Sequence, residues 1–189
     1  MLTLRFTRVV RARLHVSDEL PEPPRSTGAL GDWYVHLVRF GRSQLALATS
    51  ERSLLTVLLP AREMRTKLAP NLRASVGALL ETLCVPHAAI VREIAAMEPV
   101  AFGRATNRRI LGSMNDLAFQ ASVYIARDSH DLLAISRRLA RTPMSAIGRK
   151  PARSVSRTRS PARSSLRTPP DAAPRRLAPR LELTPRSAP

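Results

Sequence analysis

Hydrophobic and polar residues alternate along several stretches near the start of the chain. Residues 2–6 (LTLRF) alternate with a period of two, which predicts a half-buried strand. Residues 33–40 and 44–49 predict two further strands, joined as a hairpin through Gly41. The apolar run 54–59 fits either a buried strand or a helical turn, and we favour a short helix there.

Helical periodicity replaces this alternation from residue 61 onward. Apolar residues recur every three or four positions between 61 and 83, so we expect one amphipathic helix there. Pro70 interrupts that pattern and predicts a kink or the start of a second helix. Pro86 is suited to the first turn of the next helix, which ends before Pro99.

A last long helix is predicted after Thr106, a residue that commonly caps helices. Its apolar residues run from Ile110 to Ile125 at helical spacing, and residues 132–139 predict a further helix. Gly112 inside this helix costs about 1 kcal/mol relative to alanine. We therefore expect another element to pack closely against that position.

A short helix capped by Thr7 and a loop at 20–31, which contains three prolines, separate the first two predicted strands. Together these elements predict an α+β domain over residues 1–142, with a small antiparallel sheet packed with four or five helices. Residues 143–189 differ from the rest, because they hold nine of the 16 prolines and no apolar period. That composition predicts a disordered tail rich in Arg, Ser and Pro.

The net charge of +17 divides almost evenly between these two parts. Residues 1–142 carry 20 basic and 12 acidic residues, a surplus of +8, and the tail carries 11 and two, a surplus of +9. Such a tail is typical of an arm that contacts nucleic acid without sequence preference. A GC-rich reading frame that continues past its usual stop produces the same mixture, so the tail is either functional or an accidental extension.

Common catalytic and cofactor motifs are absent from the sequence. It contains no GxGxxG, GxxxxGK[ST], GxSxG or HExxH pattern, so we assign no catalytic residue and no cofactor. Cys84 is the single cysteine, and the four histidines have no metal-ligand spacing, so we assign no metal site. With no apolar run of membrane-spanning length and no signal peptide, we expect a cytoplasmic protein that does not enter a membrane.

Two polar clusters lie inside or beside apolar elements. Asp32 directly precedes the aromatic pair that begins the second strand. The other cluster surrounds the start of the last long helix and comprises Arg104, Asn107, Arg108, Asn115 and Asp116. If buried, these groups would serve as structural hydrogen-bond partners; if exposed in a cleft near the helix N-terminus, they would suit an anion or a polar ligand.

Three motifs connect the chain to a known family: LGDWYVHL from Leu30, SERSLLTVLLPAREM from Ser50 and GRATNRRILGSMNDLAF from Gly103. In order and spacing they resemble an uncharacterised bacterial family known only as a domain of unknown function. The resemblance covers about residues 1–126. The chain departs from the family pattern at Ser50, where Asn is usual, and at Ala105, where Thr or Ser is usual. The resemblance implies no activity and no functional residue.

Three classes of function remain open. The first is a non-enzymatic interaction or accessory module whose partner is unknown. The second is a nucleic-acid-associated protein that uses its basic domain and tail. The third is an enzyme with an unrecognised site, which requires Asp32 and the polar residues of the last long helix to converge on one pocket.

Overall fold

A computed structural model of the chain describes residues 1–17, 19–41, 43–127 and 131–142. All of them belong to the first of two units into which the chain divides, Met1–Pro151. The predicted disordered tail, residues 143–189, lies outside the described residues, so its character and the boundary at 142 stay predictions.

Strands and helices follow one another along the described chain in an α+β order, as the sequence predicts. Their bounds are β1 (Leu2–Phe6), α1 (Arg8–Leu14), β2 (Trp33–Phe40), β3 (Ser43–Ser50), β4 (Thr56–Pro60), the 3₁₀ helix η1 (Ala61–Glu63), α2 (Met64–Thr82), α3 (His87–Ala96), β5 (Val100–Arg104), α4 (Arg108–Arg127) and α5 (Leu132–Ala140).

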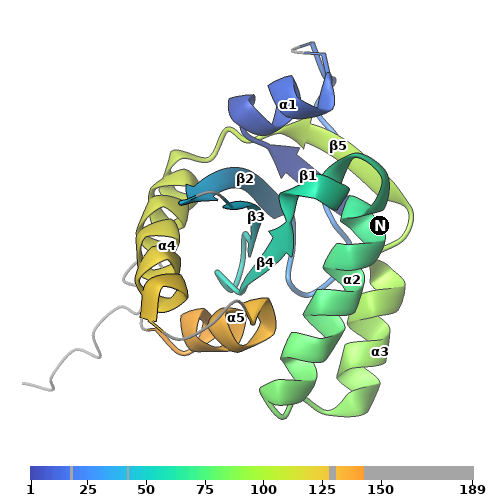
Figure 1. Ribbon diagram of the computed structural model, residues 1–189. Coiled ribbons are helices and arrows are strands. Elements are labelled where there is room, and N and C mark those ends of the chain that lie inside the picture. The colour runs from blue at the N-terminus through green and yellow to red at the C-terminus, as the bar shows by residue number, and fades with distance from the viewer. Residues whose placement is uncertain (18, 42, 128–130, 143–189) are drawn as a thin grey trace, which may run out of the picture. The chain divides into compact units, whose positions relative to one another are not determined.

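The five strands form one mixed sheet in the order β4-β3-β2-β1-β5 (Figure 1). β2, β3 and β4 are antiparallel neighbours, but β1 runs parallel to both β2 and β5. The predicted antiparallel pairing is confirmed for β2, β3 and β4, whereas the parallel pairing of β1 makes the sheet mixed. The connection from β1 to β2 contains α1, and the connection from β4 to β5 contains α2 and α3. Each returns the chain to the end of the sheet where β1 begins, so β2 and β5 both run parallel to β1. The apolar pattern of a single strand carries no information about this direction.

The run 54–59 forms most of strand β4, so the prediction of a short helix there is wrong. Leu54 adopts a positive φ of 57° and ends the turn from β3. Beyond it, Val57 and Leu58 pack into different hydrophobic clusters on the two faces of the sheet. Because both faces of the strand are buried, its apolar residues do not alternate with polar ones.

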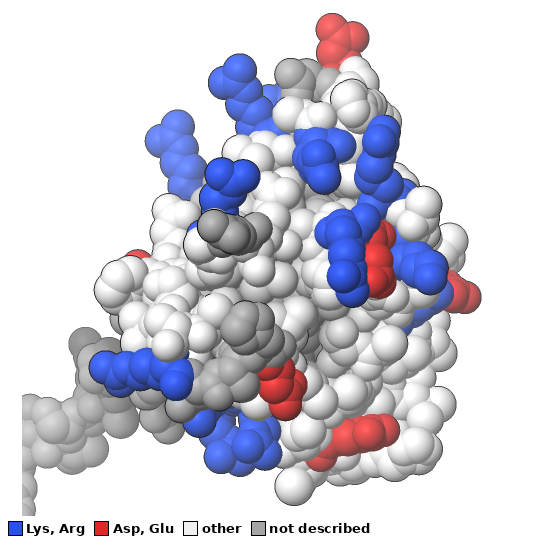
Figure 2. All heavy atoms as spheres, viewed as in Figure 1, with Lys and Arg blue, Asp and Glu red and all other residues white. Residues whose placement is uncertain are grey.

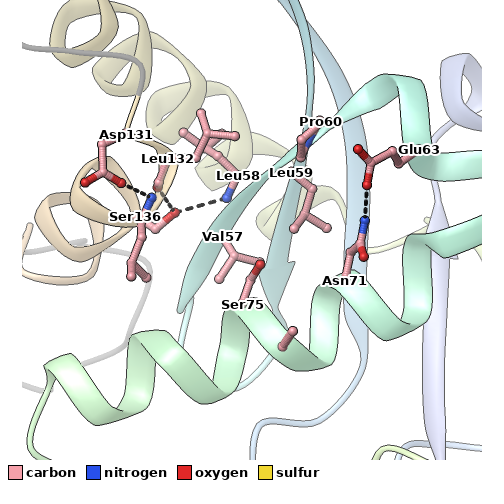
Figure 3. Close-up of a pocket in the computed structure, with 12 residues that line it drawn as sticks. Val57, Leu58, Leu59, Pro60, Glu63, Asn71, Ser75, Asp131, Leu132 and Ser136 are labelled. Carbon is pink, nitrogen blue, oxygen red and sulfur yellow. Dashed lines mark hydrogen bonds between the residues drawn. The ribbon is translucent and has the colours of Figure 1, made fainter.

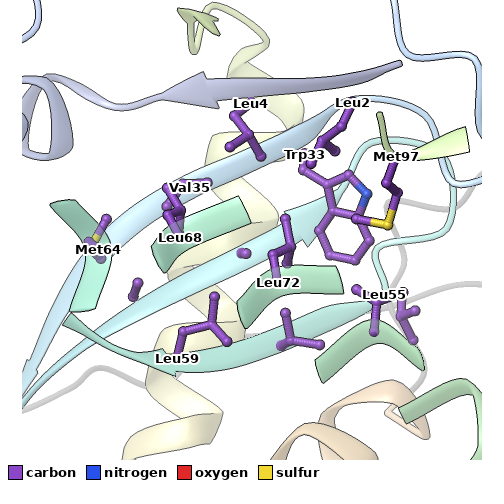
Figure 4. Packing of buried hydrophobic residues seen from close by; sticks show 14 of the residues in the cluster. Leu2, Leu4, Trp33, Val35, Leu55, Leu59, Met64, Leu68, Leu72 and Met97 are labelled. Carbon is purple, nitrogen blue, oxygen red and sulfur yellow. The ribbon is translucent and has the colours of Figure 1, made fainter. Parts of the chain in front are cut away.

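Helices cover both faces of the sheet (Figure 1). Trp33 packs with side chains of α2 and α3 on one face, while its neighbour Tyr34 packs with α4 and α5 on the other. Trp33 is fully buried, and Figure 4 shows the side chain of Met97 beside its indole ring. Leu72 of α2 is equally buried in the same cluster.

The predicted irregularity of the long helix α2 is confirmed. Lys67 leaves helical geometry, with φ −126° and ψ 16°, three residues before Pro70. Proline has no backbone N–H to donate to the preceding turn, and its ring collides with that turn. The helix therefore bends at the place that the sequence indicates.

Two local expectations about helix termini and packing are not met, and a third is met in part. Asn107, not Thr106, caps α4, because its Oδ1 accepts hydrogen bonds from the backbone N–H groups of Arg109 (3.1 Å) and Ile110 (3.4 Å). Thr7 does occupy the N-cap position of α1, as predicted, but its side chain makes no capping bond, and its hydroxyl lies 3.1 Å from Nδ1 of His36. A Cβ atom at Gly112 would meet nothing within 4 Å, so none of the described elements packs closely there.

We predict that Leu72→Ala lowers the free energy of unfolding by about 2–5 kcal/mol, because it leaves a cavity between α2 and the sheet. Denaturation in urea measures this loss. Leu133→Ala provides the control. Because Leu133 is 37% exposed, its substitution removes less buried surface than that of Leu72. Equal losses in the two variants would contradict the central position of Leu72.

Candidate functional site

The most deeply buried ion pair joins β1 to the residue that precedes β2. Nε of Arg5 donates to Oδ2 of Asp32 at 2.7 Å, and the two residues are only 4% and 1% exposed. The second carboxylate oxygen of Asp32 accepts a hydrogen bond from the backbone N–H of Ser26 at 2.8 Å. Nη2 of Arg5 donates to Glu22 at 2.7 Å and Nη1 to the carbonyl oxygen of Arg104 at 3.4 Å. We call these five residues the Arg5 cluster.

The pKa of Arg5 reflects two opposing effects. Burial lowers this pKa, but the carboxylates of Glu22 and Asp32 raise it, and the net result is a rise above the ordinary value. The guanidinium therefore stays charged within the sheet. An ion pair this buried is stable only when its remaining donors and acceptors are also satisfied, and the loop and strand partners of Arg5 do this.

The strand register explains why a loop can cover this cluster. Arg5 lies between Tyr34 of β2 and Gly103 of β5 in one row across the sheet. A Cβ atom at Gly103 would lie 2.5 Å from Cγ of Pro23, so only glycine allows the loop to approach β5 this closely. The loop is also held to β1 by a 2.5 Å hydrogen bond from Oγ1 of Thr3 to the carbonyl of Pro24.

A second group of polar residues lies next to the Arg5 cluster. Tyr34 lies near the carboxylate of Glu51, and the Asn107 side chain donates to that carboxylate at 3.5 Å. The backbone N–H of Glu51 donates to the carbonyl oxygen of Asp32 at 2.8 Å, which links the two groups. Burial and the nearby carboxylate of Glu51 raise the pKa of Tyr34. These residues come from all three sequence motifs, which therefore meet in space.

The structure brings together only some of the predicted site residues. Asp32, Arg104 and Asn107 lie around this polar region, although Arg104 contributes its carbonyl oxygen and has an exposed side chain. Arg108 is exposed in the first turn of α4. Asn115 and Asp116 are exposed farther along α4, and no hydrogen bond between described residues joins them to the Arg5 cluster.

Sequence reasoning missed Arg5, Glu22 and Glu51 as members of this region. Arg5 occupied a polar position of an alternating strand, which normally faces solvent. The position is buried because elements cover both faces of β1, and the local sequence pattern carries no signal of that coverage. Glu22 and Glu51 follow from loop geometry, which local patterns do not reveal.

The polar side chains of the two regions use their hydrogen-bonding atoms on one another and on nearby backbone groups. Asp32 uses both carboxylate oxygens, and Arg5 donates to three different acceptors. Among the residues that the structure describes, no group of three or more His, Cys, Asp or Glu side chains is placed to hold a metal ion. The arrangement favours the structural alternative for Asp32 and Asn107.

A groove of about 480 Å³ follows strand β4, which forms one edge of the sheet, between α2 and α5 (Figure 3). Ser136 occupies one backbone donor of this edge strand, because its Oγ accepts a hydrogen bond from the backbone N–H of Leu58 at 3.1 Å. Pro60 has no N–H group to offer a further strand. Asn71 donates to Glu63 at 2.8 Å, and this bond lowers the pKa of Glu63. The polar groups of the groove thus hold its walls together and protect the edge strand.

Exposed cations gather at the end of the domain where β1 and β5 finish. Figure 2 shows basic side chains over α1 and over the beginnings of α2 and α4. We call this surface the basic end and assign to it the exposed cations of α1, of the first turn of α2, of the end of β5 and of the start of α4: Arg8, Arg13, Arg65, Lys67, Arg104 and Arg108. They come from four elements, so the fold and not one charged segment assembles the surface.

Comparison with known families identifies the chain. The family described as Domain of unknown function (DUF6933) matches residues 3–155. The chain belongs to this family. The DUF6933 match confirms the resemblance of the three motifs and extends past residue 126, where we expected the likeness to end. No curated protein and no solved structure matches the chain.

The described part of this DUF6933 chain contains no helix with the length and apolar character needed to cross a bilayer. This finding agrees with the absence of a membrane-spanning run in the sequence.

We predict that Asp32→Ala lowers the free energy of unfolding by about 3–5 kcal/mol, because it leaves the charge of Arg5 buried without its partner. Urea denaturation measures the loss. Arg25→Ala provides the control, because it breaks an ion pair with Glu51 in which the Arg25 side chain is 76% exposed. That change should cost less than about 1 kcal/mol, and a similar cost for Asp32→Ala would contradict a buried pair.

We predict that Tyr34 titrates above the ordinary tyrosine pKa of about 10. The chain has two tyrosines, so a Tyr124→Phe background isolates Tyr34, and the absorbance of the phenolate follows its titration. Glu51→Gln should lower this pKa, because it removes a nearby negative charge. Since the folded protein binds this proton more tightly than the unfolded chain, the free energy of unfolding should fall as the pH rises above about 10. A titration at or below that value would contradict the burial of the hydroxyl.

Proposed function

We propose that this domain is an interaction module that performs no chemistry of its own, and that its partner is nucleic acid bound at the basic end. The observation that carries the proposal is the gathering of exposed cations from α1, α2, β5 and α4 on one surface. A surface assembled from separate elements presents charges at fixed positions, as a phosphate backbone requires.

The nature of these cations supports the same partner. All but one are arginines, whose planar guanidinium groups donate paired hydrogen bonds to phosphate oxygens. The surplus of +8 on residues 1–142 adds a favourable long-range attraction, and the tail adds +9. The engagement of the Arg5 cluster in internal bonds favours a binding role over catalysis.

Charge-neutralising variants of the full chain test the proposal. We predict that the combined substitution Arg8→Gln, Arg13→Gln and Arg108→Gln weakens binding to a labelled nucleic acid by about tenfold or more at roughly 50 mM salt. It should also reduce the slope of log affinity against log salt by about 2–3. Fluorescence anisotropy over a salt series measures both quantities.

A matched control removes the same charge elsewhere. Arg127, Arg137 and Arg141 are exposed on α4, on α5 and directly after α5, so their combined change to Gln alters the net charge equally. We expect affinity to stay within about twofold of the unchanged protein. Equal losses in the two triple variants would show attraction by overall charge, and no loss in either would contradict the basic end as the binding surface.

A further inference from the structure

An exposed aromatic side chain lies on the strand that carries Arg104 to the basic end. Phe102 on strand β5 is 47% exposed. Its ring nevertheless stacks on Phe6, with the ring centroids 5.4 Å apart and the planes inclined by 28°. Phe6 is only 1% exposed and belongs to the core. The core therefore holds the Phe102 ring in a fixed orientation while nearly half of the residue faces solvent.

An apolar hollow of about 310 Å³ lies beside this ring. Its size is at the lower end of the roughly 300–1,000 Å³ typical of small-ligand pockets. Phe6 and Phe102 form one wall, and the end of α1 and the start of α2 supply the others. The remaining lining residues are Leu14, Val16, Met64, Arg65, Thr66, Leu68, Ala69 and Pro70.

Cations flank the exposed ring on two sides. Arg104 follows Phe102 by two positions on the same strand, so both side chains point to the same face of the sheet. Arg104 is also the register partner of Phe6 on β1. Arg65, at the start of α2, lines the hollow itself. The surface thus combines an aromatic platform with positive charge, and among the described residues no acidic side chain lines the hollow.

We infer that the basic end binds single-stranded nucleic acid, with one unpaired base stacked on Phe102 over the hollow and the adjoining phosphates held by Arg65 and Arg104. This inference rests on the proposed function and specifies its substrate. In a duplex, the flat faces of the bases are covered by their neighbours, whereas a single strand presents them to aromatic side chains. Charge complementarity favours a phosphate-bearing strand over an apolar protein segment in this hollow.

Two substitutions at one position test the platform. The probes are a labelled oligothymidylate of about 16 nucleotides and the corresponding duplex. We predict that Phe102→Ala weakens binding of the single strand by about tenfold while changing duplex affinity by less than about twofold. Phe102→Trp keeps an aromatic face and should retain single-strand affinity. Phe119→Ala is the matched control, because Phe119 is 72% exposed on α4, and it should leave both affinities unchanged.

A second measurement on the unchanged protein covers the case in which Phe102→Ala does not fold. Met64 lines the hollow, so its methyl resonance should shift on addition of oligothymidylate and stay in place with the duplex. Absence of that shift, or equal losses for the two probes in Phe102→Ala, would overturn the inference. If the variant changed at Arg8, Arg13 and Arg108 binds more weakly as predicted while Phe102→Ala has no effect, the inference fails but the proposed function stands. If neither probe binds the unchanged protein, both fail.

Discussion

The ion pair between Arg5 and Asp32 is the constraint on which the arrangement of the domain depends. Two opposite charges in the interior are tolerated only with their full set of partners, and here the loop at 20–31 supplies them through Glu22 and the backbone of Ser26. The loop must therefore lie on the sheet beside β1. From that position the chain enters β2 at Trp33 in the direction that makes β1 and β2 parallel.

The buried polar residues and the exposed charged residues of the domain occupy different places. The side chains that look most like a site in the sequence, Asp32 and Asn107, hold loops and helix ends in place. The exposed charged side chains lie elsewhere. The strand order and the positions of α1, α2 and α4 bring these cations to one end of the domain. The charges of this proposed binding surface do not also support the core.

Local patterns predicted those features that depend on local energetics. The α+β class and the kink at Pro70 follow from hydrophobic period and from the missing proline N–H, so the sequence was sufficient. The direction of β1 and the strand at 54–59 depend on which elements cover each face, which no local window contains. The same reason explains why the ion pair could not be predicted. Asp32 stands out in the sequence as a polar residue beside two aromatic residues. Its partner Arg5 lies 27 positions away along the chain and has the pattern of a surface residue.

Strand β5 shows how closely the two roles are joined. Gly103 faces the loop that covers the Arg5 cluster, where Pro23 leaves no space for a side chain. Phe102 and Arg104 point to the opposite face, toward Phe6 and the basic end. Because side chains alternate along a strand, a shift of one residue in register would exchange these positions and put an arginine or phenylalanine where only glycine fits. The packing of the loop on Gly103 therefore fixes the register that exposes Phe102, so the structural ion-pair region sets the position of the proposed binding surface.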